Sequence, residues 1–168
     1  MKFYCFLAFL SLAAISTGCG TTHSVARTNG SSYSHTISIK DFLQLGRVVQ
    51  TSKGIEVTIT SDQLFLKKSS RLTKAGAAKV DSMAAAILKQ PDLKVLVIGY
   101  TDNTGTDMKN VRFSENQATR VMVELVKQGI LAANVNAVGN GPVEQVAPND
   151  SAENKAKNSR IVFEINTY

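Results

Sequence analysis

The chain has 168 residues, of which 43% are hydrophobic and 19% charged, with 19 lysines and arginines against 13 acidic residues. About 150 residues beyond a short leader suit one domain with a single core. The net charge of +6 favours anionic surfaces. The lysines are scattered and form no dense stripe, which argues against nucleic acid as a partner.

The N-terminus has the layout of a secretory signal. Lys2 is followed by the apolar run "FYCFLAFLSLAAI" and then by "STGC", which gives a basic start, a short apolar region and small residues at a cleavage site. The run is shorter than the ~20 residues that span a bilayer. Ser16 and Gly18 before Cys19 resemble a bacterial lipobox, although Ser16 replaces its usual leucine. We predict a signal peptide over residues 1–18 and lipidation of Cys19; a plain secretory leader is the alternative.

Removal of this leader takes away Cys5 and a single basic residue, so the mature chain carries a net charge of +5. With Cys19 lipidated, no thiol remains for a disulfide, a metal site or a nucleophile. Several acyl chains, at ~0.8 kcal/mol per buried CH₂, hold a chain firmly to a membrane. Residues 19–35 are polar and predict a flexible tether. His23 and His35 fall in this tether, which argues against a metal or catalytic pair.

From residue 36 the pattern becomes that of a folded domain. "RVVQT" and "IEVTIT" flank the turn "SKG" and predict a β-hairpin, because their β-branched residues alternate. The segment "SDQLFLKKSSRL" predicts a loop. Thr73 is a candidate N-cap for a helix that Pro91 ends. The apolar face of this helix is Val80, Met83, Ala84, Ile87 and Leu88.

The second half predicts strand, helix, strand, loop and strand. "LKVLVIGY" is a continuous apolar run, typical of a strand covered on both faces. A helix follows over about Met108–Gln128, and Gly129 is its expected stop. "ANVNAVGNG" predicts a short strand, "PVEQVAPNDSAENKAKN" a polar loop, and "SRIVFEI" the last strand. The expected fold class is α+β, with two helices packed on one side of a mixed β-sheet.

Five segments together carry a resemblance to a known family. They are "GYTDNTG", Asn110, "FSENQA", "VGNG" and "NDSAENKAKNSRIVFEI". This combination resembles the C-terminal OmpA-like domain, a family that includes the peptidoglycan-associated lipoproteins. The likeness implies a β-α-β-α-β-β core over about residues 54–165 within a domain at 36–168. It also implies non-covalent binding of peptidoglycan through the diaminopimelate of its stem peptide.

The resemblance implies which residues bind this zwitterionic ligand. In the family, an aspartate takes the ammonium group and an arginine takes the carboxylate through a charge-assisted contact. Asp102 matches the aspartate, and Thr101 and Asn110 match neighbouring ligand-site residues. Gln117 stands in the position of the arginine. An alternative for Asp102 is that it only caps its own loop.

Two further positions depart from the family. Ser159 replaces an arginine, although Arg160 keeps the next one, and Leu66 replaces an aspartate often found in the first loop. A neutral hydrogen bond contributes ~0.5–1.5 kcal/mol against ~1.5–3 for a charged one, so binding is expected to weaken. Lys67 or Lys68 is a candidate substitute for the missing cation. The alternative is that both are solvated loop lysines.

The sequence thus predicts a lipid-anchored outer-membrane protein whose periplasmic domain binds peptidoglycan without a cofactor or metal. The alternative is a degenerate domain that contacts other envelope proteins. An enzyme is disfavoured, since the folded part has no histidine or cysteine nucleophile and no phosphate-binding loop or zinc spacing. The sequence gives no geometry that would pair two of its carboxylates as a catalytic acid and base, for which Asp102, Asp107 and Glu115 are the candidates.

Overall fold

The computed structural model describes residues 37–90 and 92–167. The predicted signal peptide, the lipidation at Cys19 and the tether through residue 35 lie outside the described residues. No helix in the described part is both long and apolar enough to cross a membrane.

The centre of the fold is a five-stranded mixed sheet in the order β1-β2-β5-β3-β4. Only β3 and β4 are parallel; the other neighbours are antiparallel. The strands are β1 (Arg47–Gln50), β2 (Gly54–Thr60), β3 (Lys94–Tyr100), β4 (Val135–Gly141) and β5 (Arg160–Asn166). The predicted hairpin is therefore β1–β2, and the mixed sheet is confirmed.

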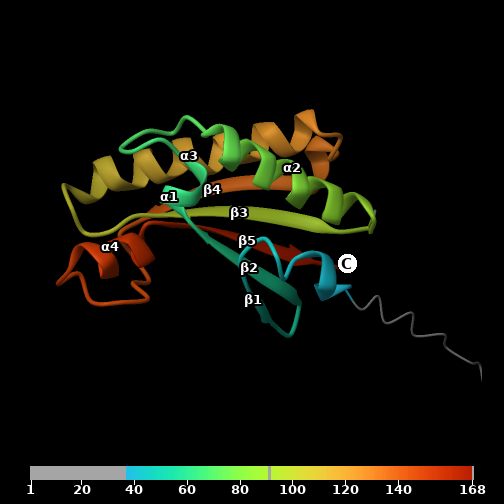
Figure 1. Ribbon diagram of the computed structural model, residues 1–168, viewed down its shortest axis with the longest axis horizontal. Coiled ribbons are helices and arrows are strands. Elements are labelled where there is room, and N and C mark those ends of the chain that lie inside the picture. Colours follow the sequence, from blue (N-terminus) through green and yellow to red (C-terminus); the bar gives the residue numbers. More distant parts are fainter. Residues whose placement is uncertain (1–36, 91, 168) are drawn as a thin grey trace, which may run out of the picture. The chain divides into compact units, whose positions relative to one another are not determined.

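Two long helices, α2 (Lys74–Leu88) and α3 (Asp107–Lys127), cover one face of the sheet (Figure 1). Thr73 caps α2 as predicted, since its side-chain oxygen accepts the Gly76 N–H at 2.8 Å. Both helices bury apolar residues against the alternating inward positions of the strands. Fully buried members of this core include Val57, Val80, Met83, Val97, Val121, Leu125, Ile161 and Phe163.

Paired glycines bring α3 close to the sheet. Gly99 of β3 and Gly139 of β4 lie opposite each other. A Cβ on Gly99 would lie 2.2 Å from the Ser114 carbonyl oxygen, and one on Gly139 would lie 2.2 Å from the Glu115 nitrogen. Because neither glycine has a side chain, the first half of α3 lies directly on the strands. This contact fixes the part of α3 that reaches the site described below.

The three central strands are in register from end to end. The trios of facing residues at the two ends are Gly54–Asn166–Lys94 and Thr60–Arg160–Tyr100. The described chain begins at the first of these ends, where the Ser38 N–H donates to Gln90 Oε1 at 3.0 Å. The opposite end, at the carboxyl end of β3, carries the polar loop that contains Asp102.

The other face of the sheet carries a smaller apolar cluster. Ile98, Tyr100 and Val162 are buried there, with Leu96 packed against them. This agrees with the apolar run in β3, which predicted a strand covered on both faces.

Two segments predicted as loops contain short helices, so the loop predictions were wrong there. The helices are α1 (Ser61–Leu64) and α4 (Ala152–Asn158). Two 3-10 turns, η1 (Ile39–Asp41) and η2 (Ala132–Asn134), complete the fold. Of the seven residues of α4 only Asn158 is buried, so α4 lacks the apolar stripe from which a helix is predicted. A cap stabilises it instead: Ser151 accepts the Asn154 N–H at 3.1 Å.

Candidate functional site

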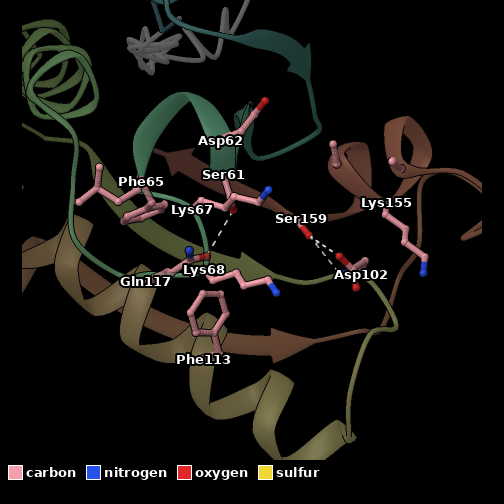
Figure 2. A pocket seen from close by; sticks show the side chains of 13 residues that line it. Ser61, Asp62, Phe65, Lys67, Lys68, Asp102, Phe113, Gln117, Lys155 and Ser159 are labelled. Atoms are coloured by element: carbon pink, nitrogen blue, oxygen red, sulfur yellow. Dashed lines mark hydrogen bonds between the residues drawn. The ribbon is translucent and has the colours of Figure 1, made fainter.

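A pocket of about 400 Å³ opens at the carboxyl end of β3 (Figure 2). Four regions build its walls: α1 with the turn after it, the loop after β3, the middle of α3, and α4 with the residue before β5. The lining residues are Ser61, Asp62, Phe65, Leu66, Lys67, Lys68, Asp102, Phe113, Gln117, Ala152, Lys155, Ala156 and Ser159. Its volume lies in the usual ~300–1,000 Å³ range of small-molecule sites.

Asp102 is held in place from two directions. Its Oδ1 accepts the Thr104 N–H at 2.6 Å, and its Oδ2 accepts the Ser159 hydroxyl at 3.2 Å. The Asp102 N–H in turn donates to Ser159 Oγ at 3.1 Å. A carboxylate has roughly four lone-pair sites, so acceptor capacity remains for a ligand. Asp102 therefore caps its own loop, as one alternative predicted, and also lines the pocket; its contact with a ligand stays a prediction.

The pKa of the Asp102 carboxyl lies below its ordinary value. Burial by itself raises this pKa, but hydrogen bonds from Thr104 and Ser159 and the positive charge of Lys155 together lower it by more. The carboxyl is therefore an anion at neutral pH, with the charge that an ammonium group requires.

Gln117 lines the pocket but uses its amide within the protein. Its Nε2 donates to the Ser69 carbonyl at 3.0 Å, and its Oε1 accepts the Ser61 hydroxyl at 3.3 Å. Only 3% of the residue is exposed. These bonds tie α3 to α1 and to the turn after it, so the amide links three elements of the pocket wall.

That turn spans residues 66–69 and carries two lysines. It is closed by the Ser69 N–H, which donates to the Leu66 carbonyl at 3.0 Å. Lys68 has φ 53°, in the left-handed region, and a turn with positive φ at its third residue favours glycine. Lys67 and Lys68 are both exposed and both line the pocket.

A third lysine, Lys155, reaches the pocket from α4. Within residues 37–90 and 92–167, the side-chain ammonium groups of Lys67, Lys68 and Lys155 form no hydrogen bond and no ion pair. The neighbouring Lys157 differs, because it pairs with Glu153 at 3.0 Å. The pocket thus has three cationic side chains with no partner in the described part of the chain.

Two of the predicted ligand residues, Thr101 and Asn110, are not among the residues that line the pocket. Asn110 is buried beneath the loop, where its Nδ2 lies 3.5 Å from the Asp102 carbonyl. Thr101 is also buried; its N–H donates to the Gly141 carbonyl at 2.8 Å, while its Oγ1 has no partner in the described part. Their positions suit support of the Asp102 loop.

Arg160, the retained family arginine, is only 5% exposed. Its guanidinium lies 3.8 Å from the ring centroid of Tyr100 and donates to the carbonyls of Asn158 and Glu144 at 3.1 and 2.8 Å. The Tyr100 hydroxyl donates to Glu144 Oε2 at 2.6 Å. Burial and this hydrogen bond raise the pKa of Tyr100 to about 12. Arg160 thus braces the base of the site and is not in the pocket lining.

Sequence reasoning missed Lys155 and Phe113 in the pocket lining, and it missed the hydrogen bond from Ser159 to Asp102. Phe113 and Phe65 give the pocket aromatic walls. A signal for Lys155 was present, since Ser151 is a good N-cap and Glu153 and Lys157 have the i, i+4 spacing of a helical ion pair. Ser159 was read as a lost cation, yet its hydroxyl orients Asp102.

The fold and the pocket define a class of protein, a small α+β domain with a charged pocket at one end of its sheet. The model of the OmpA family matches residues 64–159. The chain therefore belongs to the OmpA family. The matched range lies inside the core expected from the sequence.

Three known proteins are similar to this chain. The probable lipoprotein YiaD of Escherichia coli is 35% identical over 117 residues, covering 64% of this chain and 53% of YiaD. The peptidoglycan-binding protein ArfA of Mycobacterium tuberculosis is 38% identical over 76 residues, 45% of this chain and 23% of ArfA. The solved cell wall anchor of the T6SS from Pseudomonas aeruginosa has a TM-score of 0.66 at 28% identity, covering 74% and 88% of the two chains. The chain thus spans about half or less of these two curated relatives.

Proposed function

We propose that this domain binds peptidoglycan non-covalently, with Asp102 accepting the ammonium group of a diaminopimelate-type stem peptide. The observation that carries the proposal is the Asp102 carboxylate itself. It is ionised, oriented by Thr104 and Ser159, and lines a pocket that also holds three unpaired lysines. A zwitterionic ligand needs both charges within one site.

The shape of the pocket supports the same ligand. Phe65 and Phe113 would offer apolar walls to the methylene chain of diaminopimelate, and Asp102 and the three lysines line the same pocket for its charged groups. The names of two similar proteins support a wall ligand, since ArfA is called a peptidoglycan-binding protein and the T6SS protein a cell wall anchor. Recognition of this kind needs no catalytic group and no cofactor.

In this proposal the protein links two layers of the envelope. Lipid on Cys19 holds the N-terminus in the outer membrane, residues 19–35 set the reach, and the periplasmic domain holds the wall. The name of YiaD, a probable lipoprotein, supports the lipid anchor. Wall binding through a single pocket leaves the remaining surface open to other envelope proteins.

One observation favours the second candidate, an interaction module without wall affinity. Gln117, at the position of the family arginine, has both amide atoms bonded inside the protein, and Ser159 is neutral as well. If the lysines do not replace these cations, the pocket holds an anion without a matching cation.

Co-sedimentation of the purified full-length protein in mild detergent with peptidoglycan sacculi separates the two candidates. We expect the parent to sediment and Asp102→Asn to bind roughly 10–100-fold more weakly, because a charged hydrogen bond worth ~1.5–3 kcal/mol is lost. Asp107→Asn, on the first turn of α3 and outside the pocket lining, is the matched control.

A parent protein that stays in the supernatant would refute wall binding and leave the interaction module. Equal losses in the Asp102 and Asp107 variants would show that overall charge, and not the pocket, governs sedimentation.

A further inference from the structure

We propose that Lys68 and Lys155 form a two-sided clamp that binds two carboxylates of the stem peptide, one on each side of Asp102. In this arrangement Gln117 contacts no ligand and is a positioning residue for the turn that carries Lys68. The inference rests on the proposed function and names the ligand form that the site selects: a stem peptide with free, non-amidated carboxylates.

The hydrogen bonds of Gln117 remove it from the set of ligand contacts. Its donor is used by the Ser69 carbonyl and its acceptor by the Ser61 hydroxyl, at 3.0 and 3.3 Å. A ligand carboxylate would have to displace the bond to Ser69, the residue next to Lys68. Breaking it would leave a partly buried carbonyl without this partner, which is unfavourable. The amide therefore holds the turn.

The backbone of Lys68 is the second observation. A residue with a side chain is strained at φ 53°, and glycine is the usual occupant of such a turn position. Strained residues are concentrated at ligand clamps, where the surrounding structure holds them. In Figure 2 the Lys68 side chain extends from this turn between Phe113 and Asp102. The strained backbone thus directs the Lys68 ammonium group into the pocket.

Lys155 supplies the other half of the clamp. It lines the pocket from α4, and its charge contributes to the lowered pKa of Asp102. In the view of Figure 2 it lies on the far side of Asp102 from the turn lysines. Since Lys68 and Lys155 rise from separate elements, each can bind its own carboxylate. One fork-shaped arginine would instead hold one carboxylate through two bonds.

This geometry predicts selectivity for the charge state of the ligand. A stem peptide carries the side-chain carboxylate of diaminopimelate and a further carboxylate from its neighbouring residues. Conversion of either one to an amide removes the charge that a lysine binds, and a lysine gains little from an uncharged amide oxygen.

The test is titration of the full-length protein in mild detergent with two defined stem peptides, one with free and one with amidated diaminopimelate. We expect the parent to bind the free acid about tenfold more tightly, and Lys68→Gln and Lys155→Gln each to lose about tenfold for it. Lys157→Gln is the matched control on α4, because Lys157 pairs with Glu153 and lies outside the lining. Lys68→Gly, which relieves the strained backbone, is expected to raise thermal stability and still weaken binding.

A double-mutant cycle tests the positioning role of Gln117. We expect Gln117→Leu to weaken free-acid binding, and to add nothing when Lys68→Gln is already present, because both act through one contact. Additive losses would overturn that role.

The outcomes separate the clamp from wall binding itself. If the parent binds, Asp102→Asn binds weakly, and the lysine variants match the parent for both peptides, the clamp is overturned and the proposed function stands. A parent that binds neither peptide nor sacculi overturns both.

Discussion

The two sides of the pocket are built in opposite ways. On the anionic side, hydrogen bonds from Thr104 and Ser159 fix the Asp102 carboxylate, and the buried Arg160 braces the strand behind it. On the cationic side, Lys67, Lys68 and Lys155 are unpaired within the described residues and end on flexible stems. In the proposed function, the fixed charge would set where a ligand binds, and the flexible charges would adapt to the groups that it carries.

In the proposed function, this difference would let the pocket bind a ligand without arginines at positions 117 and 159. Gln117 and Ser159 now serve the fixed parts of the pocket, the turn and the aspartate. The lysines that line the pocket lie at its rim, where a substitution disturbs little packing. Changes on the fixed side are therefore expected to affect stability as well as affinity, and changes on the rim to affect mainly affinity.

The largest expected effect comes from Arg160→Met on the fixed side. The variant loses charged hydrogen bonds to the Asn158 and Glu144 carbonyls and the contact with Tyr100. We expect the free energy of unfolding to fall by about 3 kcal/mol, measured by chemical denaturation. Arg120→Met is the control, because the Arg120 side chain is half exposed, its ion pair with Glu124 is long, at 3.9 Å, and Glu124 keeps its pair with Lys127 at 3.0 Å. Similar losses in both variants would show that Arg160 does not brace the site.

An intermediate effect is expected from pH. Since the pKa of Asp102 is lowered in the folded protein, its ionised form stabilises the fold above the unfolded pKa of about 3.9. This stabilisation is lost as pH falls through the folded value. In denaturation curves from pH 7 to 3, the parent should be more stable than Asp102→Asn at neutral pH, and the gap should begin to narrow below about pH 4.

Glu164→Gln is a control of opposite sign for this experiment. Burial and the neighbouring Glu56 raise the pKa of Glu164, so ionisation of this carboxyl destabilises the fold. The variant is expected to be more stable than the parent at neutral pH. A pH profile that is the same for both variants would contradict the opposite roles of these two carboxyls.

The smallest effect is expected from Ser151→Ala, which removes the cap of α4. Loss of the bond to the Asn154 N–H costs about 1 kcal/mol of local helix stability. Because Lys155 stands on this short helix, affinity for sacculi should fall about two- to threefold. Ser82→Ala, on the exposed side of α2, should leave binding unchanged. An unchanged affinity in Ser151→Ala would show that Lys155 needs no ordered helix.

The sequence predicted those elements whose signals are local. The β1–β2 hairpin, α2 with its Thr73 cap, the doubly covered β3 and α3 all have periodic apolar residues or recognisable ends. It did not predict α1 or α4. These helices of four and seven residues have no apolar period, and α4 is ordered mainly by its cap.

The site was predictable to the extent that it lies in one motif. Asp102 was predicted through the family motif that follows a buried strand, and Lys67 and Lys68 through their place in the first loop; all three line the pocket, and their contact with a ligand stays a prediction. The role of Gln117 did not follow, because its partners Ser61 and Ser69 lie 56 and 48 positions away. Lys155 was missed for the same reason, since only the folded chain brings α4 beside the loop after β3.

The end-to-end register of β2, β5 and β3 has a mechanical consequence. The described chain starts at one end of these strands, and the pocket lies at the other. In a protein held at both places, tension acts along the strands, at right angles to their hydrogen bonds. All backbone hydrogen bonds between these three strands then share the load, and none has to break before its neighbours. A sheet pulled in this direction is loaded in shear, and its strands do not separate one hydrogen-bonded pair at a time.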